Sequence, residues 1–127
     1  MDNYIEYFVN NFIIKDKRER ILHEFTKKPH DAQWRICHGL YEILDERLVV
    51  LSGKKLTEAD VLLEIKKHTK DKEAVILTAF DGQIKPLEEA VRICFDDPGG
   101  SVLITEGAVL WKAELDYGAP EKYVLAK

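Results

Sequence analysis

The sequence predicts an α+β protein in which an N-terminal helical layer packs on a mixed sheet of four or five strands. In the first half, apolar residues recur at the three- and four-residue spacing of amphipathic helices. In the second half, short apolar runs alternate with Gly, Pro and Asp, the residues that separate strands at turns. The sheet is therefore expected mainly in the C-terminal half. The length fits a single domain, residues 1–127.

Three helices are expected over the first 45 residues. The apolar face of the first is formed by Ile5, Phe8, Val9 and Phe12. The second is expected over residues 17–27, because Asp16 and Glu19 have the spacing of a capping box and Pro29 stops the helix. The third is expected over residues 31–45, where apolar residues recur every four positions.

The middle of the chain contains a short apolar run and two further helices. Residues 48–51 fit either a strand or the tail of the third helix. Thr57 can cap a fourth helix, and Pro86 can open a fifth in its first turn. Residues 74–80 are apolar on both faces, as a central strand requires.

Three more strands are expected at the C-terminal end, over residues 102–105, 108–115 and 122–126. The strand at 102–105 can lie in the sheet in either of two directions relative to the strand at 74–80. The strand at 74–80, the fifth helix and the strand at 102–105 together have the length of a right-handed parallel crossover. An antiparallel placement of residues 102–105 is also open, because the fifth helix could pack at the end of the sheet.

The charge is mildly acidic and evenly spread between the two halves. There are 19 basic and 23 acidic residues, a net charge of −4. This balance argues against nucleic-acid binding, which usually needs a concentrated positive surface. Residues 15–28 are the exception, because they carry six basic and three acidic side chains, a net of +3 against −7 for the remainder.

The two cysteines and the N-terminus indicate a cytoplasmic protein. Cys37 and Cys94 lie among apolar residues at helical spacing, as buried, reduced thiols do. Asp2 and Glu6 place negative charge where a secretory signal would be positive. The longest apolar runs are too short to cross a bilayer, so no membrane association is expected.

No recognised catalytic, nucleotide-binding or metal motif is present, and neither a cofactor nor a metal is expected. His23 and Glu24 begin a zinc-protease pattern, but Lys27 stands where the second histidine must be. The basic segment 15–28 supplies the main binding candidates for an anion or a partner, namely Lys17, Arg18, Arg20 and His23.

The sequence allows three roles for the Arg18 side chain. It lies beside the apolar stripe of its helix, where a guanidinium group needs a carboxylate partner. It can form an internal salt bridge to the sheet, bind an anion in a cleft, or lie on a solvated charged helix.

A second candidate region is the expected sheet edge at Asp81 and Gln83, where ligands often bind in open α/β sheets. Asp-Gly is also a common turn pair with no further role.

The aromatic residues Trp111, Tyr117 and Tyr123 lie in or near the late strands. They form an exposed patch if helices cover only one face of the sheet, and such patches mark protein partners or a dimer seam. A second helix layer would instead cover them.

The sequence thus favours a non-catalytic protein-interaction or regulatory module, with a protein partner or a homodimer. The alternative is a small-molecule or anion-binding enzyme that combines the basic segment 15–28 with a sheet-edge carboxylate.

Overall fold

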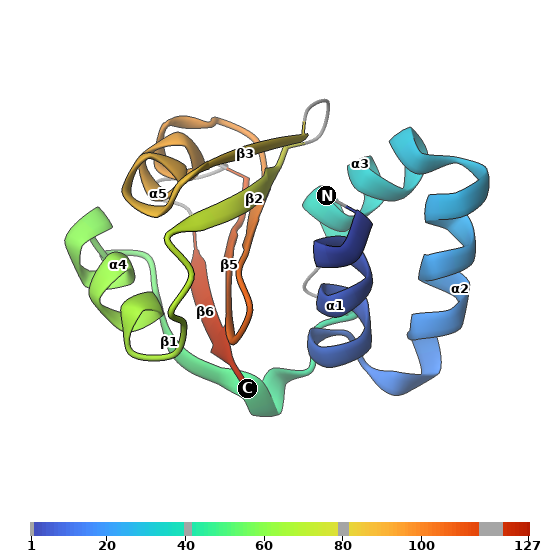
Figure 1. Cartoon of the computed structure of the whole chain (residues 1–127), viewed down its shortest axis with the longest axis horizontal. Helices are drawn as coiled ribbons and strands as arrows, with labels where there is room; N and C mark the ends of the chain where they lie inside the picture. Colours follow the sequence, from blue (N-terminus) through green and yellow to red (C-terminus); the bar gives the residue numbers. More distant parts are fainter. Residues whose placement is uncertain (1, 40–41, 79–81, 115–120) are drawn as a thin grey trace.

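The chain folds into a sheet with helices on both faces, and the predicted α+β class is confirmed (Figure 1). The computed structural model describes residues 2–39, 42–78, 82–114 and 121–127. Within these ranges the helices are α1 (Asp2–Phe12), α2 (Lys15–Lys27), α3 (Pro29–Gly39), the short 3-10 helix η2 (Glu46–Leu48), α4 (Glu58–Lys66) and α5 (Leu87–Asp96). The strands are β1 (Val49–Gly53), β2 (Glu73–Leu77), β3 (Gly82–Pro86), β4 (Ser101–Ile104), β5 (Ala108–Lys112) and β6 (Lys122–Ala126).

The six described strands pair antiparallel throughout, in the order β1-β6-β5-β4-β2-β3. The predictions of a mixed sheet and of four or five strands are therefore wrong. Strand β4 lies antiparallel to β2, so the antiparallel placement of residues 102–105 is confirmed and the parallel crossover is wrong. The unexpected strand is β3, whose Gly82 and Pro86 favour a turn and a helix start. An edge strand tolerates both residues, because one of its sides needs no hydrogen-bonding partner.

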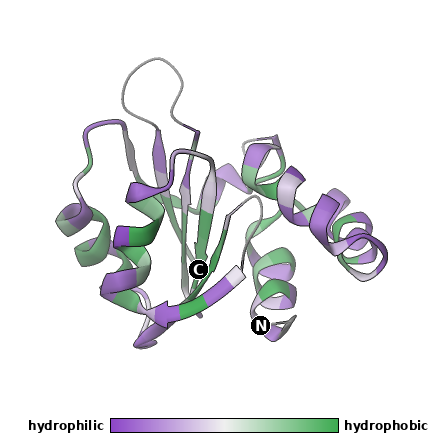
Figure 2. Cartoon of the chain, turned by 90° about the horizontal axis from the view of Figure 1, so that it is seen from above, coloured by the Kyte–Doolittle hydropathy of each residue, from purple (hydrophilic) through white to green (hydrophobic). Residues whose placement is uncertain are grey.

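Two helix layers enclose the sheet (Figure 1). Helices α1 to α3 form the layer on one face, and α4 and α5 cover the other face. Strand β2 explains why residues 74–77 are apolar throughout, since Val75 and Leu77 contact the first layer while Ala74 and Ile76 contact the second. Figure 2 shows the hydrophobic residues along the central strands, whereas α2, the outermost helix, is largely hydrophilic.

The late aromatic residues are covered by this arrangement. Trp111 is 5% exposed and stacks on Tyr123 with ring centroids 5.3 Å apart, both on the face of the α1 to α3 layer. Helices α1 to α3 cover this face and α4 and α5 cover the other, so Trp111 is buried and does not form the exposed aromatic patch. Tyr117 lies outside the described residues.

Helices α2 and α3 form a hairpin with a very short connection. Helix α2 begins at Lys15, and its N-cap residue Ile14 makes no side-chain hydrogen bond, so the predicted Asp16 capping box is wrong. Pro29 stops α2 as predicted, but it is also the first residue of α3, where a missing N–H costs nothing. Lys28 alone joins the two helices, and α3 leads from the upper end of α2 toward α1 (Figure 1).

Helix α3 ends at Gly39, so the predicted helix over residues 31–45 extends too far. The chain instead returns past the junction of α1 and α2. The Ile14 N–H donates to the Ile43 carbonyl at 2.8 Å, and the Asp45 N–H donates to the Phe12 carbonyl at 2.9 Å. Leu44 is buried at this junction. The return places residues 42–43 beside the start of α2.

Most of the remaining elements agree with the sequence, although β5 ends at Lys112 and the predicted strand over 108–115 extends too far. Strand β1 confirms the strand alternative for the apolar run at 48–51. Thr57 caps α4, and the Thr57 and Asp60 side chains exchange hydrogen bonds with each other's backbone N–H groups. Pro86 is the N-cap of α5 and also ends β3, so it lies one position before the first turn of the helix. No helix in the described ranges is long and apolar enough to cross a membrane.

Candidate functional site

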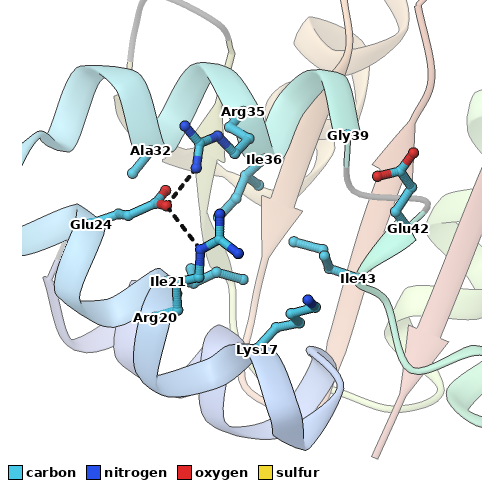
Figure 3. A pocket seen from close by; sticks show the side chains of 10 residues that line it. All are labelled: Lys17, Arg20, Ile21, Glu24, Ala32, Arg35, Ile36, Gly39, Glu42 and Ile43. Carbon is cyan, nitrogen blue, oxygen red and sulfur yellow. Dashed lines mark hydrogen bonds and ion pairs between the residues drawn. The ribbon is translucent and has the colours of Figure 1, made fainter.

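A pocket opens between α2, α3 and residues 42–43, with a volume of about 270 Å³ (Figure 3). Its floor is aliphatic and is formed by Ile21, Ala32, Ile36 and Ile43. Ile36 is 2% exposed and belongs to the core beneath the first helix layer, so the floor is part of the packed interior.

The rim of this pocket is charged, and one carboxylate lies at its centre. The Glu24 Oε1 atom is 2.5 Å from a terminal nitrogen of Arg35 and 3.5 Å from Arg20 Nε (Figure 3). The Arg20 and Arg35 side chains are 67% and 57% exposed, whereas that of Glu24 is only 24% exposed. A guanidinium group has five N–H donors, so both arginines keep donors for a ligand while they hold Glu24.

Lys17 and Glu42 complete the rim. Lys17 lies on the same face of α2 as Arg20 and Glu24, because these positions are three or four residues apart. Glu42 lies on the returning segment across the pocket from α2 (Figure 3). The rim thus holds three cationic and two anionic side chains above an aliphatic floor.

A second pocket of about 480 Å³ adjoins the first and shares Glu24 and Arg35 with it. Its other lining residues are His23, Lys27, Lys28 and Asp31. These residues lie at the end of the hairpin where α2 passes into α3. We call the two adjoining pockets together the α2–α3 groove.

The groove contains three of the four candidates from the basic segment. Lys17 and Arg20 line the first pocket, and His23 lines the second. Arg18 lies elsewhere, since its Nε donates to the Ile13 carbonyl at 2.8 Å at the junction of α1 and α2. Its charge also helps to lower the pKa of Asp45, although the hydrogen bonds from Arg47 to that carboxylate are the larger cause.

The sheet-edge candidates are separate from the groove. Gln83 lies in β3 and pairs with Ile76 of β2, at the edge of the sheet. Among the described residues that line the two pockets of the groove, none comes from β3. Asp81 lies outside the described residues. The described part of the chain therefore does not bring Gln83 together with the basic segment.

Sequence reasoning missed three charged residues of the first pocket as site residues: Glu24, Arg35 and Glu42. The pair Arg20 and Glu24 has a local signal, because oppositely charged residues four apart on a helix are neighbours. Arg35 and Glu42 have none. Their place in the pocket depends on the one-residue connection between α2 and α3 and on the early end of α3.

The two thiols are poor candidates for chemistry. Cys37 and Cys94 are both free and fully buried, and burial raises the pKa of each to about 12. A thiol that is neutral at pH 7 is a weak nucleophile. No group of three or more His, Cys, Asp or Glu side chains suited to a metal ion occurs within the described ranges.

Comparison of the chain with protein-family models, with curated proteins and with solved structures gives no match in any of the three.

Proposed function

We propose that the protein is a non-catalytic interaction module that binds a segment of a partner protein in the α2–α3 groove. One observation supports this function above the others, namely a pocket whose aliphatic floor lies beneath a rim of three cationic and two anionic side chains. An apolar side chain of the partner gains free energy on that floor when it leaves water. The cations around it then select the charge of the neighbouring residues.

The size of the first pocket supports a side-chain ligand. Sites for cofactors and drug-sized molecules measure about 300–1,000 Å³. At about 270 Å³, the pocket is suited to one large aliphatic or aromatic side chain. Binding through one or two anchoring side chains is typical of protein interfaces, where few residues carry most of the energy.

The enzyme alternative has less support. It requires the basic segment and a sheet-edge group in one site, whereas Gln83 lies apart from the groove. The buried thiols support a further part of the proposal, a cytoplasmic location, because free cysteines persist in a reducing compartment.

Selection from a random peptide library tests this function. Gly39 lines the first pocket, and a Cβ atom built there meets no atom within 4 Å, so Gly39→Leu adds an apolar side chain at the pocket without a clash at its Cβ atom. We expect the wild type to enrich peptides whose binding falls at least about tenfold in Gly39→Leu, the loss expected from removing a central anchor.

The matched control is Gly99→Leu, since Gly99 has space for a Cβ atom and lies outside the groove. It should bind the selected peptides like the wild type. Failure to enrich any peptide, or equal binding by wild type and Gly39→Leu, would contradict the proposed function.

A further inference from the structure

The two pockets of the α2–α3 groove differ in chemistry. The first has the aliphatic floor, whereas the second is lined only by charged or ionisable side chains. A ligand that fills both must therefore carry an apolar group in one part and polar or charged groups in the other.

The charge of the groove sets the sign of those groups. Its cationic side chains are Lys17, Arg20, Lys27, Lys28 and Arg35, and its carboxylates are Glu24, Asp31 and Glu42. Glu24 is already held by two guanidinium groups. The groove thus has a surplus of positive charge on a protein whose net charge is −4. An acidic ligand complements this surface and is steered to it.

The groove also sets the length of the ligand. Lys17 and Lys27 mark its ends on α2, and the rise of ten residues between them spans about 15 Å. An extended peptide covers about 3.3 Å per residue, so about five residues fit between these ends. Cations lie at both ends, and the aliphatic floor lies between Lys17 and the second pocket.

From these three features we infer that the groove binds an extended acidic peptide of about five residues that carries one large apolar side chain with carboxylates on both sides. This inference rests on the proposed function and specifies the partner's chemistry. A protein segment fits better than single-stranded nucleic acid. The described lining residues include no Phe, Tyr or Trp on which a base could stack, and the floor is aliphatic.

The test measures binding of fluorescently labelled acetyl-Glu-Asp-Leu-Asp-Glu-amide by anisotropy. We expect saturable binding that weakens as salt rises, because exposed charges are screened within about 8–10 Å at moderate ionic strength. Replacing the peptide's Leu by Ser, or its acidic residues by Asn and Gln, should each weaken binding at least about tenfold.

Charge-reversal variants of the protein locate this binding. Lys17→Glu and Lys27→Glu lie at the two pockets and touch no described ion pair, so the hairpin should keep its fold. Each should weaken binding at least about tenfold, since like charges then face each other. Arg92→Glu is the matched control, because Arg92 is an exposed residue of α5 in the opposite helix layer, and its affinity should stay within about twofold of the wild type. Thermal unfolding checks that each variant is folded.

The outcomes separate this inference from the proposed function. If the Asn and Gln peptide binds as well as the acidic one and Gly39→Leu abolishes both, the acidic inference fails and the interaction module stands. If an oligothymidylate displaces the acidic peptide at equal concentration, the ligand is nucleic acid and the inference fails. If only self-association depends on Lys17 and Lys27, the occupant is a second copy and the inference fails as well.

Discussion

At the scale of single residues, the least expected feature is Lys112, which is 1% exposed at the end of β5. Its ammonium group donates to the Asp97 backbone carbonyl beside the end of α5. Burial lowers the pKa of Lys112, and the charge of Lys122, its cross-strand neighbour, lowers it further. The nearby Asp97, Cys94 and Glu114 oppose this shift, but burial is the largest cause.

This residue predicts a pH dependence of stability. At pH values below this lowered pKa, the folded state holds Lys112 as a buried ammonium ion. The full free-energy cost of removing that charge from water then reduces the stability of the fold. Between that pKa and about 10.4, the unfolded state binds more protons, so the contribution of Lys112 to stability rises with pH. Lys112→Met removes this dependence. We expect the variant's unfolding free energy minus that of the wild type to be smaller at pH 10 than at pH 7 in urea titrations. A constant difference would show that Lys112 is not desolvated as described.

At the scale of elements, the backbone near the end of α3 lies in close contact with the loop before β4. A Cβ atom built on Gly100 would lie 2.0 Å from the Cys37 backbone oxygen, a distance that no side chain can adopt. Glycine is therefore required here so that α3 can approach the sheet. The same approach fixes the position of the α3 face that lines the groove.

Gly100→Ala should accordingly destabilise the fold by about 1–3 kcal/mol, the cost of overpacking a site that backbone atoms enclose. Gly99→Ala provides a neighbouring control, because its Cβ would meet only Asp97 Oδ2 at an ordinary 3.7 Å. Its stability should stay within about 1 kcal/mol of the wild type. Urea unfolding of both variants checks the pair, and equal stability of the two would disprove the close approach.

The elements also show where sequence reasoning succeeds. Helix α4 carries its signal locally, in the Thr57 cap and in Val61 and Ile65, which face the core, and it is found correctly. Strand β3 is missed, because Ile84 is its only large apolar residue and remains 48% exposed. An edge strand of this kind is defined by pairing with β2, which lies outside its own sequence.

The residues of the groove show the same difference between local sequence signals and tertiary contacts. Lys17, Arg20 and His23 stand out in the sequence because they lie in one basic segment. Arg35 belongs to the site only because the hairpin of α2 and α3 places it opposite Glu24. Glu42 belongs to it only because the returning chain pairs with the junction of α1 and α2. Both depend on tertiary contacts that apolar periodicity does not encode.

At the scale of the whole molecule, both helix layers cover the sheet, but only one of them forms the groove. Helices α4 and α5 cover one face of the sheet. In the other layer α1 and α3 pack on the sheet, while the largely hydrophilic α2 lies outermost and completes the groove with α3 (Figures 1 and 2). The groove thus lies on a rigid support, at the side of the molecule farthest from α4. A partner segment can bind there without any change in the sheet.

The most direct test of this account is an NMR titration of the ¹⁵N-labelled protein with acetyl-Glu-Asp-Leu-Asp-Glu-amide. Backbone amide shifts should change in α2, α3 and residues 42–43, and those of α4, α5 and β3 should stay fixed, because the support is already formed. Saturating shifts that cluster on α4, α5 or β3, or no shifts at millimolar peptide, would contradict the assignment of the α2–α3 groove as the binding site.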